Sequence, residues 1–167
     1  MPPLDIQLRQ EDAKLVFLAV AYHLGRPGSE LDPITKQPVE HGLAEVASNL
    51  QPQLQNAVAT ISLRENQARR LLSGMLGSIT ELKAYPMLDL RLDPQGNGRR
   101  STVPGFDRSL QHLFPEIDED VEESLALAER MLMLRRRLEE ATAEIEPDAV
   151  IEEPPKRRRL WPFGKNQ

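Results

Sequence analysis

Residues 62–86 read Ser-Leu-Arg-Glu-Asn-Gln-Ala-Arg-Arg-Leu-Leu-Ser-Gly-Met-Leu-Gly-Ser-Ile-Thr-Glu-Leu-Lys-Ala-Tyr-Pro and carry the clearest structural signal in the chain. Ser62 and Glu65 have the spacing of a capping box, and Pro86 ends the pattern. Between them the apolar side chains recur every three or four residues, as on one face of a helix: Ala68, Leu71, Leu72, Met75, Leu76, Ile79 and Leu82. The sequence therefore predicts a helix over residues 63–84.

The same segment contains a patch of small residues: Ser73, Gly74, Gly77 and Ser78. Each glycine costs a helix about 1 kcal/mol relative to alanine, so two of them in one turn indicate that something packs close to the backbone. We expect a neighbouring helix to cross at this close-packing patch. The alternative is that a ligand or a partner chain approaches the backbone there.

Two helices are predicted before this one. Residues 10–24 are apolar on nearly all sides and are followed by Gly25, which is typical of a helix buried at the centre of a bundle. Residues 40–61 keep one apolar stripe across Pro52, and this predicts a kinked helix. The segment between the two helices is rich in proline and glycine, which indicates a turn-rich connector.

A long helix is predicted over residues 118–146, after a short one over 107–114. Its apolar side chains are spaced alternately by four and three residues, like a coiled-coil seam: Leu127, Met131, Leu134, Leu138, Ala141 and Ile145. In a parallel homodimer through this seam, Arg130 would face Arg135 of the partner helix, and the like charges disfavour that arrangement. A second apolar stripe at Leu125, Ala128 and Leu132 favours packing within the bundle or antiparallel pairing.

Residues 86–117 have a different pattern. Leucine alternates with charged residues over 88–93, as in a strand, and the turn-forming residues of 93–98 follow. This part of the chain is predicted to be either a short hairpin or a long loop.

These patterns together predict an all-α fold. We expect an N-terminal arm over residues 1–9, a single helical domain over 10–146, and a disordered tail over 147–167 that is first acidic and then basic. The composition agrees with this, because only 4% of the 167 residues are aromatic and a core built from aliphatic residues favours helices over β-sandwiches.

Catalytic motifs are absent from the sequence. It has no cysteine, which excludes disulfides and thiolate metal sites, and its three histidines belong to no recognisable ligand or catalytic pattern. Phosphate-binding loops, dinucleotide-binding glycine motifs and nucleophile elbows are also missing. We therefore predict a protein that is not an enzyme and that needs no cofactor or metal. An enzyme with an unrecognised site is the third hypothesis.

Membrane insertion is not expected. The longest apolar run, residues 15–22, has eight residues, whereas a helix needs about 20 to span a bilayer. Acidic residues before this run argue against a secretory signal peptide. The sequence therefore predicts a cytoplasmic location.

The C-terminal residues 156–167 have the strongest contrast in charge. They carry five cations, whereas residues 1–155 hold 16 basic and 26 acidic side chains and a net charge of −10. Aromatic and aliphatic groups stand beside the cations, and the candidate interaction residues are Lys156, Arg157, Arg158, Arg159, Leu160, Trp161 and Phe163. Such groups are costly to expose, so we interpret the segment as a contact element. A disordered solubilising tail is the simpler alternative.

The sequence supports an adaptor or assembly factor, with the bundle making one protein contact and the tail a second. The main alternative is an accessory protein that binds nucleic acid or an anionic membrane surface through residues 156–167.

Overall fold

The computed structural model describes residues 2–87, 101, 103 and 105–143. Helices dominate this part of the chain, which confirms the predicted helical character. Its α-helices are α1 (Gln10–Gly25), α2 (Leu43–Leu50), α3 (Glu65–Ala84), α4 (Phe106–Leu113) and α5 (Glu123–Thr142). Its strands are β1 (Leu4–Arg9) and β2 (Val58–Leu63), and its short 3-10 helices are η1 (Gln51–Gln53), η2 (Tyr85–Met87) and η4 (Pro115–Asp118).

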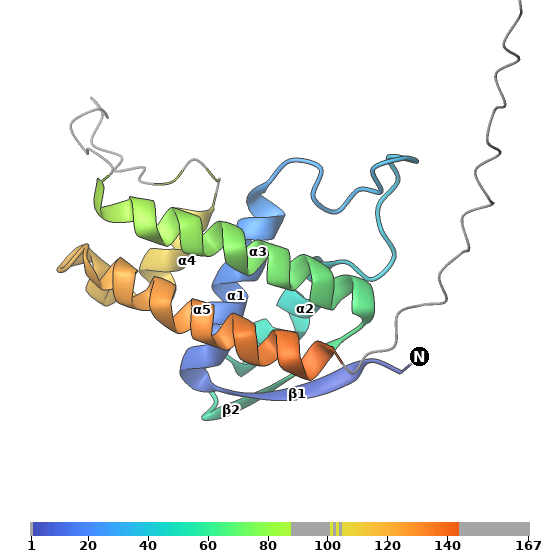
Figure 1. Ribbon diagram of the computed structural model, residues 1–167, viewed down its shortest axis with the longest axis horizontal. Helices are drawn as coiled ribbons and strands as arrows, with labels where there is room; N and C mark the ends of the chain where they lie inside the picture. The colour runs from blue at the N-terminus through green and yellow to red at the C-terminus, as the bar shows by residue number, and fades with distance from the viewer. Residues whose placement is uncertain (1, 88–100, 102, 104, 144–167) are drawn as a thin grey trace, which may run out of the picture.

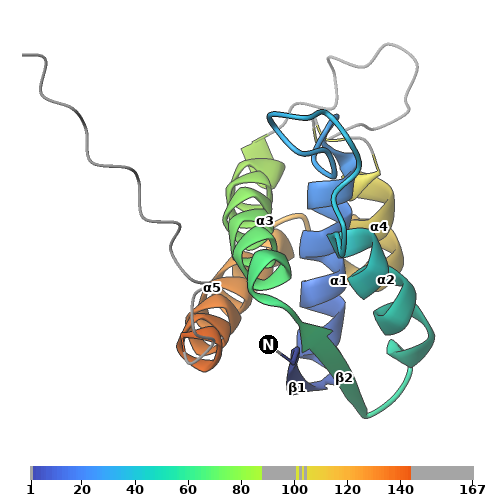
Figure 2. The same cartoon turned by 90° about the vertical axis from the view of Figure 1, so that its right-hand side faces the viewer.

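Helix α1 lies at the centre of the described elements, with α2, α3, α4 and α5 packed around it (Figures 1 and 2). This position follows from its composition, because it is apolar on almost every side. Its side chains from Leu15 to Val20 are buried except for the half-buried Phe17. It begins and ends within one residue of the range that its sequence predicts.

Helix α5 runs beside α3 in the opposite direction (Figure 1). Four side chains of the predicted coiled-coil seam are buried: Leu127, Met131, Leu134 and Leu138. Polar contacts join α5 to its neighbours as well, since Arg137 forms an ion pair of 2.9 Å with Asp12 of α1 and Arg135 Nε donates to the Leu72 carbonyl oxygen of α3. The seam therefore packs inside this chain.

The start of this last helix was predicted wrongly. Residues 115–118 form the 3-10 helix η4, and α5 begins at Glu123 rather than at 118. The physical reason is a turn between the two, in which the Asp120 carboxylate accepts a hydrogen bond from the backbone N–H of Glu122. The acidic cluster thus lies mostly in the turns before the helix and not in its first turn.

The all-α prediction is wrong at two places, where the chain forms an antiparallel two-stranded sheet. Strand β1 occupies most of the predicted N-terminal arm and pairs with β2 in a register that sets Leu4 opposite Leu63 and Arg9 opposite Val58. The helix predicted over 40–61 is also interrupted. Its first part forms α2 and η1, and its last residues belong to strand β2. The sheet lies across one end of α1 (Figure 1).

The error has a physical cause in the spacing of the apolar residues. Leu54, Val58 and Ile61 fit a helical stripe, but Ala59, Ile61 and Leu63 also fit the alternation of a strand. In the structure the latter three are buried while Val58, Thr60 and Ser62 are exposed. The strand is favoured because its backbone groups find partners in β1, far away in the sequence.

The predicted capping box is also displaced. Ser62 lies in β2, where its hydroxyl donates to the Asp5 carboxylate of β1. Arg64 takes the N-cap position of α3, and the Gln67 side-chain oxygen accepts a hydrogen bond of 2.9 Å from the Arg64 backbone N–H. The backbone N–H of Gln67 donates to Asn66 Oδ1, so only the Gln67 half of a capping box forms, and it lies two residues later than predicted.

Helix α5 ends at Thr142, with Ala143 as its C-cap, so the described helix is shorter than the predicted range that runs to 146. Two predictions fall outside the described residues: the choice between hairpin and loop within 86–117, of which 88–100 are not described, and the tail over 147–167.

Candidate functional site

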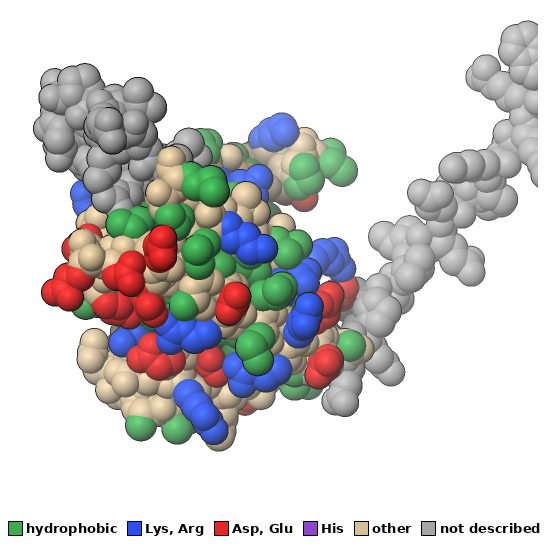
Figure 3. All heavy atoms as spheres, turned by 60° about the vertical axis from the view of Figure 1, so that its left-hand side comes forward, with side chains coloured by type: hydrophobic (Ala, Val, Ile, Leu, Met, Phe, Trp, Pro, Cys, Tyr) green, Lys and Arg blue, Asp and Glu red, His purple; other side chains and the backbone are tan. Residues whose placement is uncertain are grey.

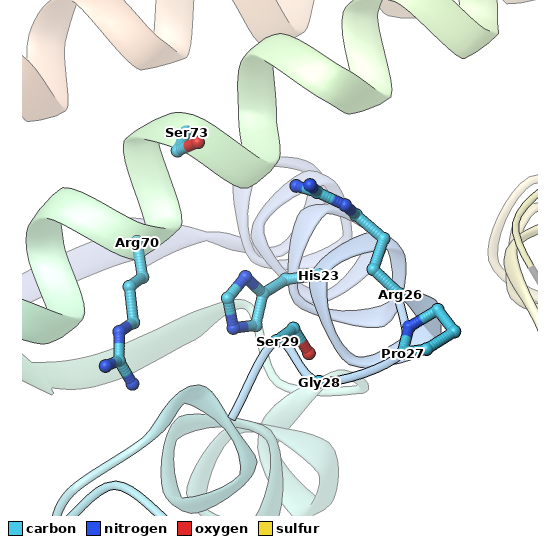
Figure 4. A pocket seen from close by; sticks show the side chains of 7 residues that line it. All are labelled: His23, Arg26, Pro27, Gly28, Ser29, Arg70 and Ser73. Carbon is cyan, nitrogen blue, oxygen red and sulfur yellow. The ribbon is translucent and has the colours of Figure 1, made fainter. Parts of the chain in front are cut away.

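A pocket of about 260 Å³ opens where the end of α1 and the turn after it meet the middle of α3 (Figure 4). Cationic and hydroxyl side chains dominate its lining, which consists of His23, Arg26, Pro27, Gly28, Ser29, Arg70 and Ser73. The ring of His23 lies between the side chains of Arg26 and Arg70, and Ser73 lies on the α3 side (Figure 4).

The turn after α1 places two of these side chains. Helix α1 ends where the backbone N–H of Arg26 donates to the His23 carbonyl oxygen, and the N–H of Ser29 then donates to the carbonyl oxygen of Arg26. Gly28 has a φ of +74°, as the third position of a type II turn requires, and Pro27 has the φ that suits the second. The turn thus brings Arg26 and Ser29 back to the side of the pocket.

Glu30 holds His23, a residue of the pocket lining, in place through its carboxylate. One oxygen of its carboxylate lies 2.7 Å from His23 Nε2 and accepts a hydrogen bond of 3.2 Å from the Leu43 backbone N–H. The second oxygen accepts from the N–H of Ala44 at 3.5 Å. Glu30 therefore caps the N-terminus of α2 from a distant part of the chain, where the helix dipole favours an anion, and it orients the imidazole of His23.

The rest of the connector is held by its own hydrogen bonds. The Asp32 carboxylate accepts hydrogen bonds from the backbone N–H groups of Thr35 at 2.7 Å and Ile34 at 2.8 Å. These bonds stabilise the ionised form and lower the pKa of the Asp32 carboxyl below its ordinary value. Further on, the N–H of Val39 donates to the Glu30 carbonyl oxygen, so the end of the connector is bonded back to Glu30.

A Glu30→Ala variant is expected to lose about 1–2 kcal/mol of unfolding free energy, because two amides of α2 lose their cap and His23 loses its acceptor. Urea unfolding measures this loss, and Glu40→Ala is the matched control because the Glu40 side chain is 91% exposed. Equal stability of the two variants would show that the Glu30 contacts contribute nothing.

The two arginines of the pocket are poorly neutralised by the protein. The nitrogen Nη1 of Arg70 is buried and has no hydrogen-bond partner among the described residues. The Arg26 guanidinium lies 5.9 Å from the centroid of the Tyr22 ring, a cation–π contact that leaves its charge uncompensated. No carboxylate is part of the described lining, and nearby Glu30 is already bound to His23 and α2. The pocket can therefore bind a hydrogen-bond acceptor that carries negative charge.

The close-packing patch lies beside this pocket, and α1 crosses it. A Cβ atom on Gly74 would come within 3.0 Å of the Ala19 carbonyl oxygen, and one on Gly77 would come within 2.1 Å of Tyr22 Cε1. Ser78 is buried and its hydroxyl donates to the Gly74 carbonyl oxygen, whereas Ser73 is exposed and lines the pocket. Gly74 and Gly77 thus face α1, Ser78 bonds within α3, and Ser73 belongs to the pocket.

The other candidates are not brought to this site. The interaction residues from Lys156 to Phe163 lie outside the described residues. His41 lies at the surface, where its Nδ1 is 3.1 Å from Glu45. Within the described ranges no group of three or more histidine, aspartate or glutamate side chains is placed to hold a metal ion.

Comparison with protein-family models, with curated proteins and with solved structures gave no match. The function must therefore be inferred from the residues themselves. None of the helices in the described part of the chain combines the length and apolar character needed to span a bilayer.

The pocket was missed by sequence reasoning. The Arg-Pro-Gly-Ser turn directly after a helix with a histidine in its last turn was a detectable signal for one half of the pocket. Arg70 gave no such signal, because it stands on α3 next to Arg69 and only the packing of α3 against α1 distinguishes the two.

Proposed function

We propose that this protein is a non-catalytic adaptor or assembly factor, in which the helical body makes one protein contact and residues 156–167 make a second. The observation that carries the proposal is the composition of the tail. Five cations and the chain's sole tryptophan follow a body with a net charge of −10. An aromatic group beside cations is suited to insertion into a groove on a partner protein, with the charges at its rim.

The body offers an outer surface for the other contact. Helices α3 and α5 pack side by side, and each has a large hydrophobic side chain that points outward: Leu76 is 48% exposed and Met133 is 65% exposed. Acidic side chains gather toward one side of the face in Figure 3, with lysines and arginines interspersed. Mixed charge around exposed apolar groups is the usual character of a protein-binding surface.

The alternative function is binding of nucleic acid or an anionic membrane surface through the same tail. Each cation near an anionic membrane surface contributes about 1 kcal/mol, so five give a few kcal/mol before entropy is subtracted. The negative charge of the body would repel a long polyanion, and contact would be restricted to the tail. A cytoplasmic location suits either function.

Deleting residues 156–167 is expected to leave the melting temperature nearly unchanged and to reduce recovery of the partner sharply. The buried core of the described residues extends from Leu8 to Leu138, so the deletion removes none of it. Affinity purification followed by mass spectrometry, with the full chain and the deletion variant in parallel, measures the loss. Identical recovery of every component by both forms would refute the proposal and leave a solubilising tail.

Two finer variants separate the alternatives. Replacing Trp161 and Phe163 by alanine should abolish docking into a protein groove and only weaken attachment to a polyanion, whereas replacing Arg157, Arg158 and Arg159 by serine should have the reverse effect. Binding to vesicles of phosphatidylserine and phosphatidylcholine and to a labelled single-stranded DNA tests the polyanions directly. A binding constant that falls steeply with salt in either assay would select the alternative function.

A further inference from the structure

The pocket between α1 and α3 has a chemical character that the proposed adaptor function does not use. Its polar side chains come from two arginines, one histidine and two serines. The arginines and serines can donate hydrogen bonds to a ligand, whereas Nε2 of His23 already pairs with Glu30. Both arginines carry a permanent charge, and the nearest carboxylate described above, that of Glu30, is held by His23 and the N-terminus of α2. The pocket therefore has donors and positive charge in excess of what the protein itself satisfies.

Arg70 shows this excess most directly. A buried N–H group without an acceptor lowers stability, and more so when the group is charged. The Nη1 nitrogen of Arg70 has no acceptor among the described residues, although its neighbour Arg69 forms an ion pair with Glu65. Arg70 also lines the pocket, so an anion bound there would compensate the charge of its guanidinium, although Nη1 itself is covered by protein atoms.

The number and charge of the donors favour phosphate over carboxylate. A phosphate group presents three acceptor oxygens and up to two negative charges, which matches the two guanidinium groups. The hydroxyls of Ser29 and Ser73 lie beside the two arginines (Figure 4) and can donate further hydrogen bonds, whereas the His23 ring pairs with Glu30 and forms part of the wall. One carboxylate would leave part of this set unused.

The size of the pocket limits the ligand. Its volume of about 260 Å³ is below the range of about 300–1,000 Å³ that is usual for sites of drug-sized ligands. A phosphate ion, or a phosphate monoester with a short organic part, suits this space, whereas the phosphate of a larger molecule would need the remainder to extend into solvent.

We infer that this pocket is a binding site for a phosphate group, free or in a small monoester, with Arg26 and Arg70 on either side of the pocket and His23, Ser29 and Ser73 in its lining. The inference is independent of the tail, because every residue that carries it lies between 23 and 73.

The test is a titration of the isotope-labelled full chain with inorganic phosphate, glycerol phosphate and acetate at constant ionic strength, followed by amide chemical shifts. Saturable shifts at Gly28, Ser29 and Ser73 with both phosphates, and much weaker ones with acetate, are expected. Tighter binding of glycerol phosphate would assign a monoester as the ligand, and tighter or equal binding of inorganic phosphate would assign the free ion. Shifts that fail to saturate with either phosphate, or that acetate reproduces at equal concentration, would overturn the inference.

Matched variants locate the site. Arg70→Gln is expected to weaken phosphate binding about tenfold or more, since a charge-assisted contact is lost, whereas Arg69→Gln removes the same charge from an ion pair at the surface and should have no effect. Arg26→Gln on the exposed turn is a second variant and should also weaken phosphate binding, with thermal unfolding as the check that loss of the Tyr22 contact leaves the fold intact. Replacement of Arg157, Arg158 and Arg159 by serine should leave the shifts unchanged. Equal weakening by the Arg69 and Arg70 variants, or loss of binding in the tail variant, would show diffuse attraction and no pocket site.

Discussion

A Leu134→Asp variant is expected to lose cooperative folding, whereas Met133→Asp, one residue earlier, should keep the melting temperature of the native chain. Leu134 is 1% exposed and Met133 is 65% exposed, so the same substitution meets the core in one case and solvent in the other. Removing a buried leucine costs about 2–5 kcal/mol, and placing a carboxylate there adds several more. Their sum approaches or exceeds the total stability of about 5–15 kcal/mol that is usual for a domain.

Circular dichroism during thermal and urea unfolding measures both variants, and size-exclusion chromatography reports their oligomeric state. This pair also tests whether the seam of α5 serves the chain itself or a second copy. If Leu134→Asp gave a folded monomer from a chain that otherwise self-associates, the seam would be intermolecular and the packing of α5 against α3 would not hold in solution.

A Gly77→Leu variant is expected to destabilise the fold by about 1–3 kcal/mol through overpacking, although leucine favours a helix by nearly 1 kcal/mol over glycine. A Cβ at this position would come within 2.1 Å of the Tyr22 ring. That ring has little freedom to move away, because it packs edge-on against Phe106 with centroids 6.0 Å apart and lies beside the Arg26 guanidinium. The substitution therefore forces α1 and α3 apart or displaces the ring.

Urea unfolding at equilibrium gives the change, and Thr80→Leu is the control on an exposed position of the same helix. Gly74→Ala should cost less, since its Cβ would meet the Ala19 carbonyl oxygen at 3.0 Å. A double-mutant cycle isolates the contact: Gly77→Ala should be less costly in a Tyr22→Ala background than in the native chain. A higher melting temperature for Gly77→Leu would mean that this face of α3 is open, and a partner or ligand would then explain the glycines.

Periodicity in the sequence located the three long helices α1, α3 and α5 well, apart from their exact ends. A helix satisfies its backbone groups within its own segment, and its buried face repeats every three to four residues, so a local pattern carries the information. The two glycines of α3 indicated a close approach for the same reason, since their cost falls on the helix that contains them.

The tertiary structure alone decided the sheet, the displaced cap and the pocket. The apolar residues of strand β2 fit both the helical and the strand period. The strand forms because the backbone groups of β1, at residues 4–9, pair with it. The N-cap of α3 is Arg64 and not Ser62, because Ser62 is part of strand β2. The pocket exists because α1 crosses α3 at the small residues and so brings Arg26 and Ser29 close to Arg70. The sheet and the pocket join residues that are distant in the sequence, and the cap is displaced because Ser62 contacts Asp5 across the sheet; only packing places these residues together.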